Sequence, residues 1–362
     1  MSHQVPKGRV ALIATILFFA FFLTTEVTHA EVTPGDTGNF ITTWNTENPG
    51  TSANNQITIP GTGGGYNYDV YWVNTASSTQ TGTTTTTSSS LTLTFPEPGI
   101  YQVEIAGAFP RIFFNNGGDR QKILTVEQWG DIAWNSMDRA FNGASNLRVP
   151  ASDAPDLSGV TSMYRMFRAA TVFNDPVNHW DVSNVDTING LFWEAANFNQ
   201  SLNDWNISSA TNISNAFRGA IQFNQPLDNW DTSLVFSMSS MFSGAIQFNQ
   251  DLSNWNISSI TPDANCSAND GMCNIFLGVA LSTHNLDATL QSWAQQAVDN
   301  NIQNIPLHLG LKTYSQTGAT AIQTLRDLGW TVDEQYKATY SPSTRATLLG
   351  QGTQSPLNSN DT

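Results

Sequence analysis

The stretch SMSSMFSGAIQFNQDLSNWNIS (237–258) contains the pattern that organises this chain of 362 residues. Its two phenylalanines, one asparagine and one tryptophan recur every 25 residues over four units. The four columns are Phe167, Phe192, Phe217 and Phe242; Phe173, Phe198, Phe223 and Phe248; Asn174, Asn199, Asn224 and Asn249; and Trp180, Trp205, Trp230 and Trp255. Because a fixed period of about 20–50 residues is typical of stacked repeats, the sequence predicts a stack of such units.

One unit of this length cannot bury its apolar face alone, so its neighbours must cover it. The aromatic columns are therefore expected to form a continuous core. The asparagine column is expected to form an amide ladder that bonds backbone groups of the next unit. Weaker units at 136–150 and 275–278 flank the four, as terminal units of a stack do. The repeated residues are predicted to be structural, and any binding function to lie at the variable positions between them.

This repeat resembles that of the BspA-like leucine-rich-repeat surface proteins of bacteria. Residues 40–72 and 99–134 are similar to the amino-terminal module of that family, and residues 281–296 and 324–332 to its closing segment. The resemblance implies an α+β multidomain fold, in which an amino-terminal immunoglobulin-like (PKD-like) β-sandwich precedes a leucine-rich-repeat-like solenoid with a helical carboxy-terminal cap. It also implies export and adhesion without catalysis, since no catalytic residues are attributed to the repeat of this family.

The segments that flank the repeats carry ordinary strand and helix signals. Short stretches between Gly, Pro and Asn predict the strands of a β-sandwich. These strands are expected at 57–60, 66–74, 91–95, 100–107 and 111–114. The run TGTTTTTSSS (81–90) predicts a flexible hairpin tip. Toward the carboxyl end, apolar periodicity predicts a helix over 283–298, a second helix over 318–328 that ends before a glycine, and a short strand at 330–332.

The first thirty residues have the features of a secretory signal peptide. Lys7 and Arg9 precede an apolar run at 10–23, which is shorter than the roughly 20 residues that a transmembrane helix needs. Small residues then lead to a predicted cleavage after Ala30. We therefore expect a secreted or cell-surface protein with no transmembrane segment after cleavage; an uncleaved anchor is the alternative. The predicted domains are the signal peptide 1–30, the PKD-like β-sandwich 31–125, the repeats 126–278, the cap 279–336 and a disordered tail 337–362.

Charge and cysteine content narrow the function further. Lys+Arg is 14 and Asp+Glu is 29, a net charge of −15, which argues against a nucleic-acid partner because phosphate binding needs clustered Lys and Arg. In an exported chain, Cys266 and Cys273 are predicted to form a local disulfide. The chain shows no motif for catalysis, a cofactor or a metal. Calcium at Asn265, Asn269 and Asp270 is the alternative to a solvated loop there.

The sequence thus predicts an adhesion or recognition protein that is not an enzyme and that binds an extracellular protein or glycan. The predicted binding face is the polar row that follows the tryptophans, Asp181, Asn206, Asp231 and Asn256. Because the repeats are acidic, a modestly cationic protein or a neutral glycan is favoured as the partner. Two alternatives stay open: an extracellular carbohydrate-active enzyme with the repeats as its scaffold, and a structural spacer.

Overall fold

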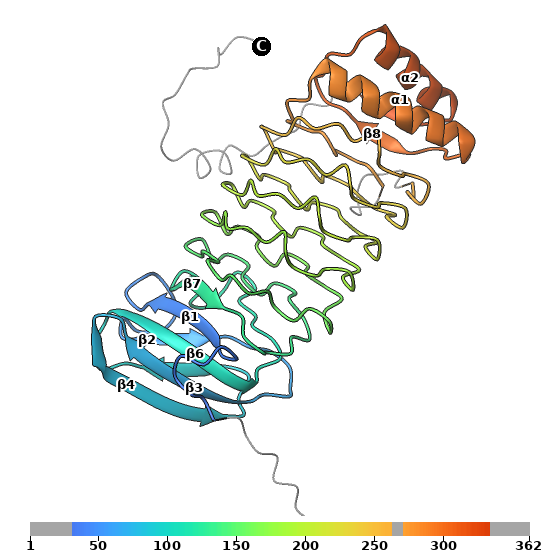
Figure 1. Cartoon of the computed structure of the whole chain (residues 1–362). Helices are drawn as coiled ribbons and strands as arrows, with labels where there is room; N and C mark the ends of the chain where they lie inside the picture. The colour runs from blue at the N-terminus through green and yellow to red at the C-terminus, as the bar shows by residue number, and fades with distance from the viewer. Residues whose placement is uncertain (1–30, 263–270, 334–362) are drawn as a thin grey trace, which may run out of the picture.

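A computed structural model of the chain describes residues 31–262 and 271–333 (Figure 1). The molecule is elongated, with strands at the amino-terminal end, two helices at the other end and the repeats between them (Figure 1). The regular elements are β1 (Phe40–Asn45), β2 (Gln56–Ile59), β3 (Asn67–Asn74), β4 (Ser77–Thr86), β5 (Leu91–Thr94), β6 (Ile100–Ala108), β7 (Ile123–Gln128), α1 (Thr283–Asp299), β8 (Pro306–His308), α2 (Gln316–Asp327) and β9 (Thr331–Asp333).

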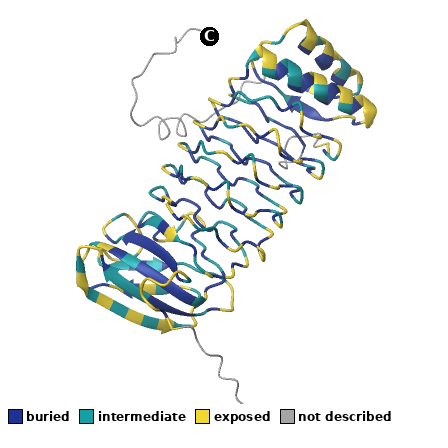
Figure 2. Cartoon of the chain, viewed as in Figure 1, coloured by how far each residue is buried: buried dark blue, intermediate teal, exposed yellow. Residues whose placement is uncertain are grey.

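The expected sheet-rich domain is present at the amino-terminal end. Its five-stranded antiparallel sheet has the order β4-β3-β6-β1-β7, and β2 pairs with β5 in a second, two-stranded sheet. Side chains such as Tyr68, Val103 and Trp44 are at most 1 % exposed and form its core, and buried residues run along the central strands (Figure 2). The predicted strand at 111–114 does not form. Instead, Phe114 donates its N–H to Ala140 O at 3.2 Å and so begins the stack of repeats.

The prediction of a flexible hairpin tip at 81–90 is wrong. Most of the threonine tract belongs to β4, which pairs with β3 at the edge of the large sheet. Threonine is β-branched and therefore fits a pleated strand whose outer face meets water. The threonine tract therefore forms an edge strand, in which half-buried and exposed side chains alternate along most of its length.

The predicted leucine-rich-repeat-like solenoid is also wrong. Leucine-rich repeats contribute a β-strand from every unit, whereas the described residues between β7 and α1 form neither a strand nor a helix. Most of the regular structure is antiparallel sheet in the amino-terminal domain. Successive units are joined instead by turns and by isolated parallel bridges, such as Ser162 to Thr187 and Asn212 to Ser237. The repeats are therefore a stack of turns.

A left-handed backbone at two positions of a unit explains the turns. Arg165 and Ala169 have φ angles of 54° and 57°, whereas an extended strand needs negative φ throughout. The chain therefore closes into turns, as in the bond from Arg168 N–H to Arg165 O at 3.2 Å. The backbone N–H groups of the two left-handed residues bond to the following unit. Arg165 N–H donates to Asn189 O at 3.0 Å, and Ala169 N–H donates to Trp193 O at 2.7 Å.

The predicted helical cap is corrected to a small α/β unit. Its helices α1 and α2 lie where the sequence predicts helices, but β8 and β9 pair in parallel beside them. Ser282 caps α1, because its side chain accepts the N–H of Asn285 at 3.2 Å. The unit packs on the repeats through the rings of Phe276 and Trp293, whose centroids are 5.8 Å apart.

Replacing Ala169 by Gly is expected to raise the free energy of unfolding by about 0.5–1 kcal/mol. A left-handed L-residue costs roughly 1–2 kcal/mol, while the extra freedom of glycine in the unfolded chain offsets about 0.5–1 kcal/mol of that gain. Gly143 and Gly219 already hold the equivalent left-handed position in other units, with φ of 83° and 69°. Thermal unfolding measures the change, and a lower melting temperature for A169G would show that the backbone there is not strained.

Candidate functional site

The aromatic columns lie in the core of the repeats. The eight phenylalanines and four tryptophans are at most 3 % exposed. The rings of Phe167, Phe192 and Phe217 stack with centroids 5.9 and 5.6 Å apart. Trp205 Nε1 donates to Val177 O of the preceding unit at 2.9 Å, and the next two tryptophans repeat this bond. None of these rings offers a free face to a sugar, so any ligand must be bound by other residues.

The asparagine column joins one unit to the next. Asn199 N–H donates to Asn174 Oδ1 at 2.8 Å, and Asn224 and Asn249 repeat the bond at 2.9 and 2.8 Å. Ser282 N–H ends the series on Asn249 Oδ1 at 2.7 Å. These amide oxygens satisfy backbone donors along the turns, which assigns the column a structural role that extends to the start of α1.

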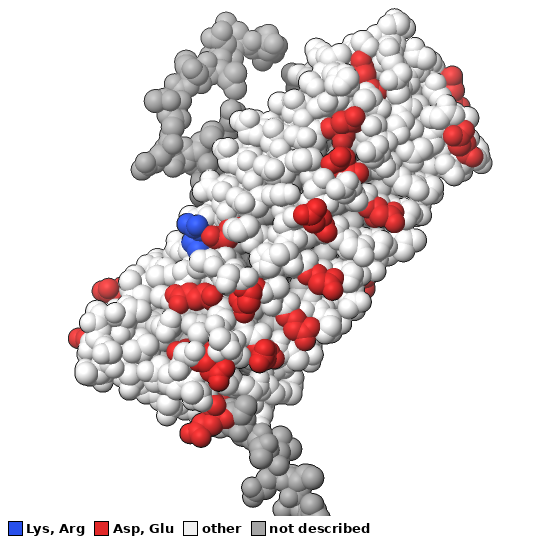
Figure 3. All heavy atoms as spheres, in the orientation of Figure 1, with Lys and Arg blue, Asp and Glu red and all other residues white. Residues whose placement is uncertain are grey.

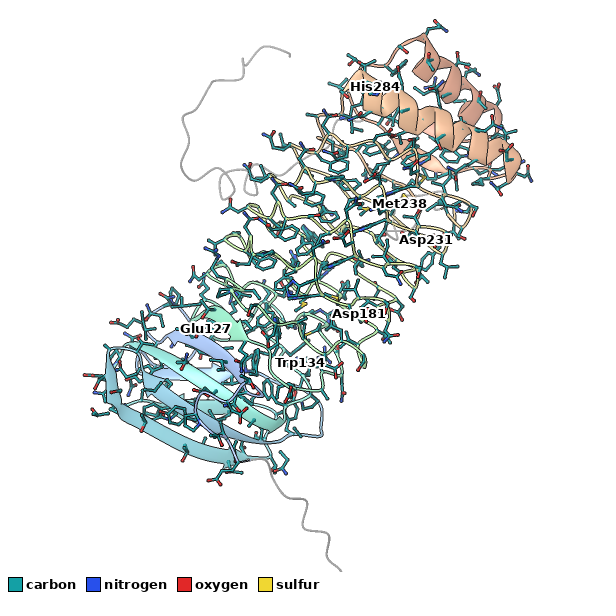
Figure 4. The ribbon with its side chains drawn as sticks, in the orientation of Figure 1. Glu127, Trp134, Asp181, Asp231, Met238 and His284 are labelled. Atoms are coloured by element: carbon teal, nitrogen blue, oxygen red, sulfur yellow. The ribbon has the colours of Figure 1, made fainter. Side chains whose placement is uncertain are left out.

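The predicted binding row, Asp181, Asn206, Asp231 and Asn256, is exposed, and Asp181 and Asp231 lie along the same side of the stack (Figure 4). Each side-chain Oδ1 accepts the backbone N–H of the serine two residues later, at 2.8–3.1 Å. Hydrogen bonds from that serine lower the pKa of Asp181 and Asp231. The row therefore closes a turn in each unit, whether or not a partner contacts it. Acidic side chains are spread over the face seen in Figure 3, where basic ones are nearly absent.

Variable positions of the repeats bring together a group of arginines and aromatic rings. We call this group the arginine–aromatic cluster: Arg111, Arg139, Arg165, Arg168, Arg218, Phe113, Tyr164 and Trp193. In six pairs, a guanidinium carbon lies 4.2–5.0 Å from a ring centroid. Trp193 takes part in three of these pairs and Tyr164 in two. Cation–π contact of this kind is worth about 0.5–2 kcal/mol and fixes the position of the cation.

The register of the stack creates the cluster. Arg168, Trp193 and Arg218 occupy the same position in three successive units, spaced by 25 residues. Ala169 N–H bonds Trp193 O, and Glu194 N–H bonds Arg218 O, both at 2.7 Å. The Trp193 indole therefore contacts two guanidiniums of the unit before it, Arg168 and Arg165, at 4.2 and 5.0 Å, and one of the unit after it, Arg218, at 4.8 Å.

Positive charge exceeds negative charge in the cluster. Asp138 accepts from Arg111 at 3.1 Å and from Arg139 at 3.4 Å, and Glu194 lies 3.6 Å from Arg168. Five guanidiniums against these two carboxylates leave a local charge of 5 − 2 = +3 in a chain of net charge −15.

The arginines at the centre of the cluster lack full compensation. Within the described ranges, neither Arg165 nor Arg218 has a carboxylate at ion-pair distance. Burial lowers the pKa of Arg165, as do the positive charges of Arg168 and Arg139, while Tyr164 and the charge of Asp138 counteract part of that shift. The cluster can therefore accept an anion without first losing one of its own ion pairs.

Sequence reasoning missed this cluster, although one signal was present. The repeat columns are uniform, whereas the positions beside them change from Arg, Tyr and Trp in the early units to Ser in the later ones, as at Ser240 and Ser243. The expectation that function lies at variable positions applies to these residues. Their arrangement follows only from the stacking, because Arg165 and Arg218, which both contact Trp193, are more than fifty residues apart in the sequence.

Several other predictions concern residues that lie partly or wholly outside the described ranges. Cys273 is buried and disulfide-bonded, while its predicted partner Cys266 and the calcium candidates Asn265, Asn269 and Asp270 lie outside the described residues. The signal peptide and the tail after 336 lie outside them as well. Over 31–262 and 271–333, no three His, Cys, Asp or Glu side chains gather as metal ligands would, and neither helix has the length and apolarity to span a membrane.

Comparison with known proteins identifies a family for the repeats. No curated protein and no solved structure matches the chain. Two overlapping segments, residues 110–220 and 202–301, match the family described as "Mycoplasma protein of unknown function, DUF285". Together they cover more than half of the chain and include every member of the arginine–aromatic cluster. The chain therefore belongs to the DUF285 family.

Proposed function

We propose that this protein is an exported, non-catalytic binding protein whose repeats recognise an anionic extracellular partner through the arginine–aromatic cluster. The local charge of +3 within an acidic chain carries the proposal. Guanidinium groups present paired N–H donors that match carboxylate and phosphate oxygens. Export follows from the signal-peptide features of residues 1–30, and binding at the cell surface accords with the resemblance of the repeat.

The environment of the arginines supports recognition of a specific anion. The side chains of Arg139 and Arg168 are only 32 % and 25 % exposed, and charges act more strongly where water is partly excluded. Tyr164 and Trp193 hold the guanidiniums against their rings. A binding site that is ordered in advance loses less entropy when its ligand arrives.

The cluster changes the expected chemistry of the partner. The acidic row at Asp181 and Asp231 favours a cationic protein or a neutral glycan, but the oxygens of that row are already used to close turns. Among the described residues, no carboxylate lies at ion-pair distance from the guanidinium of Arg165 or of Arg218. An anionic partner therefore fits the repeats better.

The alternative of a carbohydrate-active enzyme has a weaker basis. Asp228 and Asp251 line an open hollow of about 220 Å³, which is smaller than the roughly 300–1,000 Å³ typical of small-molecule sites. Asp228 Oδ1 accepts from Asn203 Nδ2 at 2.9 Å, and Asp251 Oδ1 accepts from Ser253 N–H at 2.8 Å. Both carboxylates thus serve the repeat itself.

The binding proposal is tested with an array of acidic and neutral glycans and matrix proteins. The full chain is expected to bind anionic spots, and the triple variant R165Q/R168Q/R218Q to bind them at least about 100-fold more weakly. Each charge-assisted hydrogen bond is worth roughly 1.5–3 kcal/mol, and 1.4 kcal/mol is tenfold in affinity.

The single variant R165Q is expected to bind more weakly than the parent protein, and its matched control is R326Q, which changes the net charge equally but lies in α2. R326Q is expected to bind like the parent protein, and unfolding curves establish that each variant is folded. Silence on every spot, or equal binding by the triple variant, would refute the proposed function. Binding through the acidic row would appear as a loss of signal in D181A/D231A instead.

A further inference from the structure

The backbone around the cluster is already engaged. Arg165 N–H donates to Asn189 O, Gly190 N–H to Ser214 O at 2.8 Å, and Glu194 N–H to Arg218 O. An extended peptide gains much of its affinity by adding a strand to free backbone groups of its receptor. The turns beneath the cluster present no such edge, so recognition there depends on side chains.

The aromatic rings are also engaged. Trp193 meets three guanidiniums within 5.0 Å, and Tyr164 meets two within 4.8 Å. Single-stranded nucleic acid binds largely by stacking its bases on aromatic rings, and here guanidiniums cover these rings. The net charge of −15 further disfavours a nucleic acid, whose phosphates extend far beyond the cluster.

The cations are arranged along the axis of the stack. Arg139 and Arg165 hold equivalent positions in adjacent units, and Arg168 and Arg218 hold equivalent positions two units apart. Hydrogen-bonded neighbouring segments lie about 4.8 Å apart, so the latter pair is separated by roughly 10 Å along the axis. A line of fixed positive charges suits a chain molecule that carries negative charges at fixed intervals.

We propose that the arginine–aromatic cluster binds a linear acidic polysaccharide, with carboxylate or sulfate groups on its sugars, that runs along the axis of the stack. This inference rests on the proposed function and specifies its partner. A stiff sugar chain keeps its anionic groups at regular distances, whereas an acidic peptide without backbone bonds must order every side chain at an entropic cost. The arginine forks then bind the anionic groups from the side, and no sugar ring needs to stack.

The test is a competition assay with the full chain immobilised. The probes are hyaluronan, which carries a carboxylate on alternate sugars, chondroitin sulfate, neutral dextran, poly-L-glutamate and single-stranded DNA. Hyaluronan or chondroitin sulfate is expected to bind, with affinity that rises from two to eight sugars and then levels off once the cluster is spanned. Dextran is expected not to bind.

Two triple variants distinguish recognition by the planar guanidinium groups from attraction by positive charge alone. R165Q/R168Q/R218Q is expected to lose at least 100-fold in affinity for the acidic polysaccharide. R165K/R168K/R218K keeps the charge but not the planar forks or their stacking, and is expected to lose about tenfold. Equal binding by the lysine variant would show that charge alone suffices and would overturn recognition by the forks.

The remaining outcomes separate this inference from the proposed function. If poly-L-glutamate or DNA binds through the same arginines more tightly than either polysaccharide, the polysaccharide inference is overturned while the proposed function stands. The same holds if neither polysaccharide binds although the array signal still depends on the arginines. Polysaccharide binding that R165Q/R168Q/R218Q leaves unchanged would overturn both.

Discussion

Replacing Trp205 by Ala is expected to lower the free energy of unfolding by about 3–5 kcal/mol, the range for loss of a large buried aromatic side chain. Trp205 is 3 % exposed, and its ring centroid lies 6.4 Å from that of Phe192. The substitution leaves a cavity between two units and removes the donor to Val177 O. Because a unit in a stack contacts only its neighbours, this defect also weakens the coupling between the two halves. Urea unfolding of the full chain measures the loss.

The control is Trp205→Phe, which keeps an aromatic ring and removes the indole N–H. Val177 O still accepts the N–H of Trp180 at 3.1 Å, so the lost hydrogen bond is expected to cost about 1 kcal/mol, and the phenylalanine ring leaves a smaller cavity than alanine does. The remainder of the W205A effect is then due to burial. A melting curve for W205A that matches the parent protein would contradict the core role of the tryptophan column.

The burial of the uniform columns could be predicted because each column recurs at an exact period in the sequence. A tryptophan every 25 residues has no reason to recur unless neighbouring units bury it, and Trp205 and Trp255 are buried. The helices α1 and α2 were predictable from apolar periodicity and from the glycine that follows α2. Such features depend on residues close in sequence or on an exact period.

The backbone of the repeats could not be predicted in the same way. Arg165 and Glu194 adopt left-handed φ angles of 54° and 62°, and neither residue type signals that conformation. Only glycines at equivalent places, such as Gly190 and Gly219, point to it. The resemblance to leucine-rich repeats, each of which contributes a strand, outweighed that signal.

The arginine–aromatic cluster shows a different limit. The overall composition does not reveal the positive charge of the cluster, because the chain is acidic and has only 14 Lys and Arg in 362 residues. Through the register of the turns, Arg165 and Arg218 contact the same Trp193 ring, and Arg111 is linked to Arg139 through Asp138. The left-handed backbone at Arg165 is not special to the cluster, because Asn215 and Ser240 hold the same position in later units with φ of 57° and 54°.

Replacing Lys122 by Met is expected to lower the free energy of unfolding by about 3–5 kcal/mol, because hydrogen bonds to a charged donor are worth roughly 1.5–3 kcal/mol each and the attraction of Lys122 to the Asp119 charge is lost as well. Lys122 is 1 % exposed. Its Nζ donates to Ser52 Oγ, Ala53 O and Gln56 O, each at 2.9 Å. Burial lowers its pKa, and the charge of Asp119 counteracts that shift. Methionine fills similar space but removes the ammonium donor, so that Ala53 O keeps only the N–H of Gln56 and Gln56 O only the hydroxyl of Ser52.

The partner charge lies in the same buried cluster. Asp119 is 1 % exposed and accepts the N–H groups of Thr51 and Thr58 at 2.7 and 2.6 Å, and the hydroxyl of Ser52 at 2.6 Å. Burial raises its pKa, but the hydrogen bonds from Ser52, Thr58 and Thr51 outweigh burial and hold the pKa below 3.8. Without Lys122 this carboxylate remains buried with no compensating cation beside it.

A double-mutant cycle with Asp119→Asn isolates the pair. The double variant is expected to lose less than the sum of the single losses, because the asparagine substitution removes the charge that Lys122 compensates. The folded-state pKa of Asp119 is depressed, so its contribution is complete above pH 3.8 and is lost as the pH falls through the folded value. The gap in stability between the parent protein and K122M should therefore narrow on acidification. Additive losses, or a gap that does not change with pH, would show that Lys122 stabilises the fold through its hydrogen bonds alone.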